Sequence, residues 1–135
     1  MVADYQSCQT TTDTKHCTMD LVINLIRLAA FTLLFTIFFA IFVGGTQPAA
    51  VNLFTPPWDK VVHCLVYGIM LGLVSVAFPK TNLKLLAISI IAVGSLDEIH
   101  QIYIPGRSAG LDDLAADVIG VLIIFFTIRW IASRK

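Results

Sequence analysis

The feature of this sequence that most constrains its fold is a stretch of 23 residues, from Leu21 to Val43, with one charged side chain, Arg27. At a rise of 1.5 Å per residue, a helix of this length extends about 35 Å, enough to cross the roughly 30 Å hydrocarbon core of a bilayer. A cleaved signal peptide has a shorter apolar run after a basic segment, whereas this run follows a tail of mixed charge. The stretch therefore predicts a retained transmembrane helix.

Three further apolar segments follow this stretch. Residues 61–78 contain no Asp, Glu, Lys or Arg. In residues 114–131 the only charged residues are Asp117 and Arg129. Residues 85–96 are also apolar, but 12 residues is a length shared by buried and re-entrant segments. Only 13% of the chain is charged, against roughly 25% in average soluble domains. We therefore predict an all-α, polytopic membrane protein with four transmembrane helices.

The positions of the Lys and Arg residues indicate how these helices are oriented. With four spans, seven of the nine Lys and Arg residues lie on the side of both termini, and only Lys60 and Arg107 lie on the other side. The excess of basic residues on cytoplasmic loops predicts that both termini are cytoplasmic. Residues 1–20 are then a polar cytoplasmic tail and residues 21–135 the transmembrane domain. The expected partners are membrane lipids, while the scattered basic residues argue against nucleic acid.

Most acidic residues gather at the outer ends of the predicted helices. Because residues four apart share a face of a helix, the spacing places His63 with Tyr67, Glu98 with Gly94, and Asp117 with Asp113. Placing a charged side chain at the bilayer centre costs about 2.5 to 3.5 kcal/mol of free energy on insertion scales. Ionisable residues within the spans should therefore face protein or a wet cavity. The six acidic residues of this cluster are Asp59, Asp97, Glu98, Asp112, Asp113 and Asp117.

Each of these residues also has a structural interpretation. Asp112 and Asp113 are suited to a helix N-terminus, Lys60 to snorkelling, and His63 to a neutral position in the core. Arg107 is placed to neutralise Glu98 or Asp113. Contact with water at the membrane interface does not by itself explain why six acids gather beside only two bases and a histidine. The pattern therefore favours a functional polar pocket over a purely structural cluster.

Metal ligation is the weaker interpretation of the same residues. Asp59, His63, Glu98 and Asp117 carry donor atoms for a divalent ion, but no motif with two histidines, such as HExxH, is present. The three cysteines show no CxxC pair and predict neither a zinc ribbon nor a disulfide framework. We therefore predict no metal and no cofactor.

The order and spacing of three polar blocks over residues 55–125 resemble the VanZ-like family. The blocks are Asp59-Lys60-x-x-His63-x-x-x-Tyr67, Asp97-Glu98-x-x-Gln101-x-x-x-Pro105-Gly106-Arg107 and Asp113-x-x-x-Asp117-x-x-Gly120. The sequence departs from the family at Asp117, a position that is often Asn. The resemblance implies a small polytopic protein of the bacterial cytoplasmic membrane, in a family associated with resistance to the glycopeptide teicoplanin. By position, it implies these polar site residues: Asp59, Lys60, His63, Tyr67, Glu98, Gln101, Arg107, Asp113 and Asp117.

Two classes of function follow from these residues. In a membrane enzyme acting on an envelope or lipid-linked substrate, the candidate catalytic residues are His63, Glu98 and Asp113, with Arg107 clamping an anionic group. In a binding protein, the same pocket captures a lipid head group, a lipid-linked cell-wall precursor or the glycopeptide. In both classes, the substrate-binding residues are Asp59, Lys60, Tyr67, Gln101, Arg107 and Asp117. A purely structural membrane protein is the remaining alternative.

Overall fold

The computed structural model describes residues 11–47, 57–107 and 110–134 of the chain. These residues form four α-helices: α1 (Thr11–Phe42), α2 (Trp58–Ala77), α3 (Leu83–Gln101) and α4 (Leu111–Ala132). A short 3₁₀ helix, η2 (Gly44–Thr46), follows α1, and none of the described residues forms a strand. The prediction of an all-α protein is confirmed.

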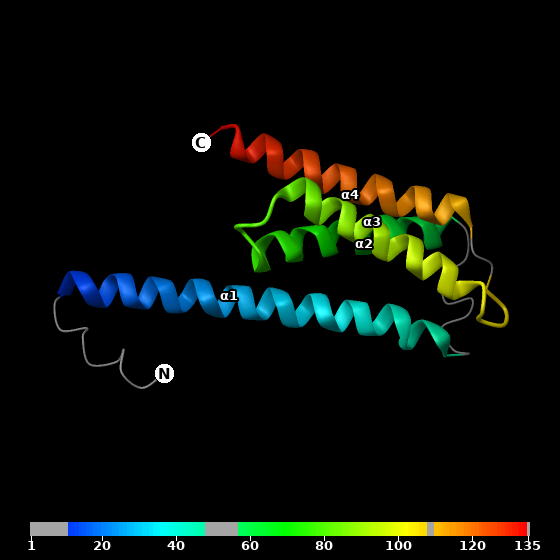
Figure 1. Ribbon diagram of the computed structural model, residues 1–135, viewed down its shortest axis with the longest axis horizontal. Coiled ribbons are helices and arrows are strands. Elements are labelled where there is room, and N and C mark those ends of the chain that lie inside the picture. The colour runs from blue at the N-terminus through cyan, green and yellow to red at the C-terminus, as the bar shows by residue number, and fades with distance from the viewer. Residues whose placement is uncertain (1–10, 48–56, 108–109, 135) are drawn as a thin grey trace.

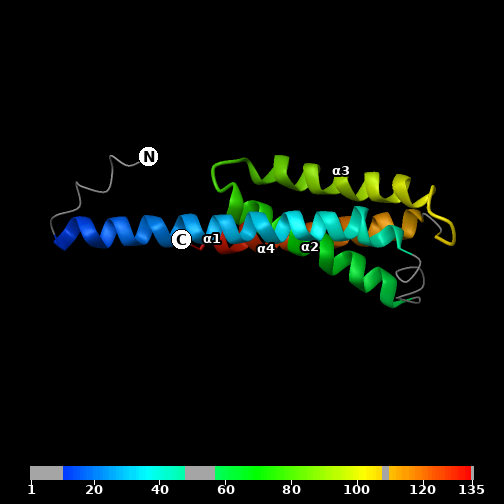
Figure 2. The ribbon, with the colours of Figure 1, turned by 90° about the horizontal axis from the view of Figure 1, so that it is seen from below.

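Three of the helices are long and apolar enough to cross a membrane, namely His16–Thr46, Trp58–Ala77 and Leu111–Ala132. The helix α3 is the exception because Lys84 lies in its first turn and Asp97 and Glu98 lie near its end. At 19 residues it still extends about 28 Å, and it lies alongside α2 and α4 (Figures 1 and 2). The chain is therefore a multi-pass helical membrane protein, and the third segment is longer than its 12 apolar residues suggested.

The helices α2, α3 and α4 pack together, and α1 lies against them mainly through α2 (Figure 2). The buried core is apolar and comes from these three helices. It comprises Tyr67, Met70, Leu71 and Val74 of α2, Leu86, Ala87 and Ile90 of α3, and Val121 of α4. In the part of α1 whose side chains are described, only Ala30 is buried. The apolar side chains that α1 exposes are suited to contact with lipid.

Two glycines allow α2 and α4 to approach closely. A Cβ atom on Gly120 would overlap the backbone of Cys64, and one on Gly68 would lie 3.0 Å from the carbonyl oxygen of Gly120. Small residues at such positions permit close packing of membrane helices. This close approach brings the polar residues in the first half of each helix together.

The polar residues lie at one end of the bundle. In Figure 1, the C-terminal ends of α1 and α3 and the N-terminal ends of α2 and α4 meet at that end. The opposite end holds the start of α1, the turn between α2 and α3, and the end of α4. At that turn, the side chain of Asn82 caps α3 by accepting a hydrogen bond from the backbone N–H of Lys84, at 2.9 Å. This chain path agrees with the predicted alternation of spans, while the orientation relative to the cytoplasm stays a prediction.

Candidate functional site

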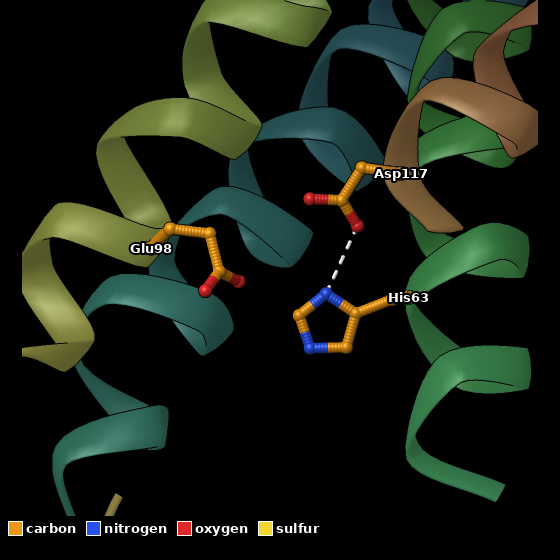
Figure 3. A group of neighbouring side chains, drawn as sticks. All are labelled: His63, Glu98 and Asp117. Carbon is orange, nitrogen blue, oxygen red and sulfur yellow. Dashed lines mark hydrogen bonds and ion pairs between the residues drawn. The ribbon is translucent and has the colours of Figure 1, made fainter. Parts of the chain in front are cut away.

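The centre of the polar end is a contact between α2 and α4. The Nδ1 atom of His63 lies 2.9 Å from Oδ1 of Asp117, and the Asp117 side chain is fully buried while that of His63 is 16% exposed (Figure 3). Both residues follow the predicted helix stripes and face the interior of the bundle. A carboxylate in this position fixes the orientation of the imidazole ring and leaves its second nitrogen for another partner.

Glu98 brings α3 into the same cluster. Its carboxylate faces His63 and Asp117, and one donor atom from each of the three residues lies within 4.8 Å of the others (Figure 3). Its Oε2 atom accepts a hydrogen bond of 2.8 Å from the backbone N–H of Gly110, just before α4. We call His63, Glu98 and Asp117 the central triad.

Two oxygens of the central triad have no hydrogen-bond partner among the described residues. These are Oε1 of Glu98 and Oδ2 of Asp117, and both are buried. Buried polar atoms in folded proteins nearly always have a partner, so each exception calls for an explanation. A bound polar group or ion would satisfy both atoms.

A second network of hydrogen bonds lies beside the central triad. The hydroxyl of Tyr67 donates a hydrogen bond of 3.1 Å to Oδ2 of Asp97, and Nε2 of Gln101 donates one of 3.0 Å to the same oxygen. All three side chains are buried. Gly94 makes room between the two networks, because a Cβ atom there would lie 2.8 Å from Oδ2 of Asp117 and 3.3 Å from the Tyr67 ring.

Asp97 lies in the site, although it was not among the predicted site residues. It was one of the six clustered acids, but the matched motifs drew attention to its neighbour Glu98. Its spacing of four from Gln101 was a usable signal, since the two share a helix face. The side chains of adjacent residues on a helix point in different directions, and here the side chains of both Asp97 and Glu98 are buried.

Lys60 forms the outer rim of the site. Its ammonium group lies 2.6 Å from Asp112, 2.9 Å from Asp113 and 3.4 Å from Asp59, and it is about one-third exposed. Lys60 therefore joins the N-terminal ends of α2 and α4 by ion pairs. Such partly exposed pairs contribute little to stability individually, and their main effect here is to neutralise part of the acidic excess.

Arg107 lies in the turn that follows α3. Gly106 adopts a left-handed conformation with φ of 85°, which favours glycine, and the backbone N–H of Arg107 donates to the carbonyl of Ile104 at 3.1 Å. The Arg107 side chain is half-buried. The turn thus keeps a cation at the same end of the bundle as the central triad.

The fold and the site define a polytopic α-helical membrane protein with a buried, acid-rich polar cluster at one end of the bundle. Over residues 2–132 the chain matches the VanZ/LLP1 family, and it belongs to that family. The resemblance inferred from the three polar blocks is therefore confirmed. No curated protein and no solved structure matches the chain.

Proposed function

We propose that this VanZ/LLP1 protein binds the polar head group of a lipid-linked envelope molecule, such as a cell-wall precursor, at the polar end of its bundle. The observation that supports this most strongly is that Glu98 and Asp117, whose carboxylates lie beside His63, each keep one buried oxygen without a hydrogen-bond partner among the described residues. A head group rich in hydroxyl and amide N–H groups would supply the missing donors.

Each predicted binding residue has a place in this proposal. Glu98, Asp117 and His63 contact the polar groups of the ligand, while Lys60 and Arg107, at the same end of the bundle, attract its anionic groups. Asp59 and Asp113 hold Lys60, and Tyr67 and Gln101 hold Asp97 beneath the central triad. The exposed apolar surface of the helices leaves the acyl chain of the ligand in the bilayer.

Direct binding tests this proposal. The purified full-length protein is titrated with a lipid-linked cell-wall precursor and with phosphatidylglycerol, and the complexes are counted by native mass spectrometry. We expect saturable binding of the precursor that weakens in Glu98→Gln and Arg107→Ala and is retained in Asp20→Asn, which changes an exposed acid on α1. Equal binding of both lipids, or wild-type binding by both pocket variants, would refute the proposal.

Resistance gives the corresponding cellular measurement. In a teicoplanin-susceptible host, we expect expression of the wild-type protein to raise the inhibitory concentration of teicoplanin, and expression of Glu98→Gln at equal membrane abundance not to do so. If both proteins change susceptibility equally, the pocket has no part in resistance.

Acid–base catalysis on such a molecule is the second candidate function. It is favoured by the 2.9 Å contact between His63 and Asp117, an arrangement in which a carboxylate orients an imidazole toward a reacting group. Glu98 or Asp113 would then act as the second acid or base. The test is analysis of lipids and wall precursors from expressing membranes: a product made by the wild type and not by Glu98→Gln supports an enzyme, and unchanged lipids and precursors exclude one.

A further inference from the structure

Three helices contribute one metal-binding type of side chain each to the central triad. His63 comes from α2, Glu98 from α3 and Asp117 from α4, and their donor atoms lie within 4.8 Å of one another (Figure 3). One imidazole nitrogen with two carboxylate oxygens is a donor set suited to divalent transition metals such as Zn²⁺ and Mn²⁺. The sequence favoured no metal because it has no motif with two histidines, and a donor set drawn from three helices does not contain such a motif.

The burial of these donors is the second observation that points to a cation. Asp117 is 0% exposed and Glu98 8% exposed, and each carries a buried oxygen without a hydrogen-bond partner in the described part of the chain. Carboxylates withdrawn from water are costly unless they are paired or bind a metal. Two carboxylates and a neutral imidazole carry two negative charges, which one divalent ion balances.

The spacing of the triad also fits coordination. In an octahedral site with bonds of about 2.1 Å, neighbouring ligand atoms lie about 3.0 Å apart and opposite ones about 4.2 Å apart. The 2.9 Å between Nδ1 of His63 and Oδ1 of Asp117 therefore matches two neighbouring ligands as well as a hydrogen bond. The donor atoms lie up to 4.8 Å apart, so ligation by Glu98 would require its side chain to move closer to the other two. The proton between His63 and Asp117 would leave when the ion binds.

Most of the other acidic residues at this end have partners for their oxygens. Asp59 also has a buried oxygen without a described partner, but its second oxygen lies 3.4 Å from Lys60. Asp112 and Asp113 are already paired with Lys60, and Asp97 accepts hydrogen bonds from Tyr67 and Gln101. We propose that His63, Glu98 and Asp117 bind one divalent transition-metal ion between α2, α3 and α4. The chain supplies all three donors, so metal binding can be measured without the proposed lipid ligand, although both proposals draw on the same three side chains.

The test measures metal binding without any added lipid. The purified full-length protein is stripped with a chelator in detergent, and Mn²⁺ and Zn²⁺ are titrated separately by calorimetry. We expect one ion per chain, with the affinity at least ~10-fold lower in Glu98→Gln and in His63→Gln. The matched controls Asp112→Asn and His16→Gln change an acid at the same end and an exposed histidine on α1, and they should bind as the wild type does.

Absence of saturable binding would overturn the proposal, and so would an equal loss of affinity in Asp112→Asn and Glu98→Gln, which would indicate diffuse attraction to acids. The wild-type Mn²⁺ complex gives a measurement that does not depend on variant folding. Electron spin echo spectroscopy should detect coupling to a histidine nitrogen, and its absence would contradict ligation by His63. Metal binding without precursor binding would refute only the proposed function, and the reverse would refute only the metal site.

Discussion

At the scale of single residues, the site depends on glycines at which even a Cβ atom would overlap a neighbouring helix. Gly120 lies against the backbone of Cys64, and backbone atoms cannot rotate away as a flexible side chain can. The close approach of α2 and α4 holds His63 within hydrogen-bonding distance of Asp117. A methyl group at Gly120 would therefore affect both the packing of the bundle and the geometry of the site.

We predict that Gly120→Ala destabilises the protein by about 1–3 kcal/mol, because overpacking forces the two helices apart. The measurement is thermal unfolding in detergent, followed by circular dichroism. Gly72→Ala is the matched control, since a Cβ atom on Gly72 of the same bundle meets nothing within 4 Å. Equal melting temperatures for the two variants would show that α2 and α4 are not in close contact at Gly120.

Removal of the Tyr67 hydroxyl gives a second prediction at this scale. Tyr67→Phe deletes one of the two hydrogen bonds donated to Oδ2 of buried Asp97, and we expect a loss of about 1–3 kcal/mol in the same unfolding measurement. Tyr103→Phe, which alters a hydroxyl on a residue that is 79% exposed, should leave stability unchanged. A neutral Tyr67→Phe would indicate that Asp97 does not depend on this donor.

The sequence predicted much of the site at this scale, for an identifiable reason. Helical spacing of four correctly placed His63 above Tyr67 and Asp113 above Asp117, because that geometry is local to one helix. The partner of each residue across the bundle was harder to predict. The spacing suggested Glu98 or Asp113 as the acid that Arg107 neutralises, but it did not predict that Lys60 pairs with Asp113. The register between helices depends on packing at Gly68 and Gly120 rather than on spacing within one helix.

At the scale of helices, the sequence predicted where the apolar segments lie more accurately than where the helices end. The helix α1 begins at Thr11, ten residues before the apolar stretch, because polar residues 11–20 include no proline or glycine to end it. The helix α3 continues through Asp97 and Glu98 to Gln101, and these buried polar side chains find partners that include Tyr67 on α2 and the backbone N–H of Gly110. Hydropathy along the sequence does not show that a polar side chain is buried against residues from elsewhere in the chain, so it does not predict this helix end.

The predicted topology of α3 can be measured by cysteine labelling in intact cells. In a variant without Cys8, Cys17 and Cys64, we expect a membrane-impermeant maleimide to label Tyr103→Cys from outside and Thr81→Cys only after the membrane is permeabilised. The reason is that these positions lie at opposite ends of α3. Ile88→Cys, on the exposed face of the helix, should stay protected in both conditions because lipid covers it. Labelling of positions 81 and 103 from the same side would exclude a spanning α3.

At the scale of the whole molecule, the apolar surface determines where the protein resides. The described helices expose large apolar side chains around the bundle, and charged side chains concentrate toward the two ends. Trp58 lies at the start of α2 and Trp130 near the end of α4, so the two exposed tryptophans mark opposite ends of the bundle. Aromatic side chains at such positions typically lie at the membrane–water interface.

We therefore predict that lipids brominated near the head group quench both tryptophans more strongly than lipids brominated near the chain ends. The measurement is fluorescence of the reconstituted protein, and the variants Trp58→Phe and Trp130→Phe report each site separately because the chain has two tryptophans. Stronger quenching of either residue by chain-end bromines would place that end of the bundle in the hydrocarbon core.

The hydrogen bond from the N–H of Gly110 to Glu98 has a consequence for how the site responds to occupancy. The carboxylate that faces His63 and Asp117 also anchors the first residue before α4, so a ligand and the backbone compete for one side chain. If a ligand bound both Glu98 oxygens, the hydrogen bond between Glu98 and the N–H of Gly110 would be lost. Occupancy of the site would then be transmitted to the start of α4, beyond the three side chains that hold the ligand.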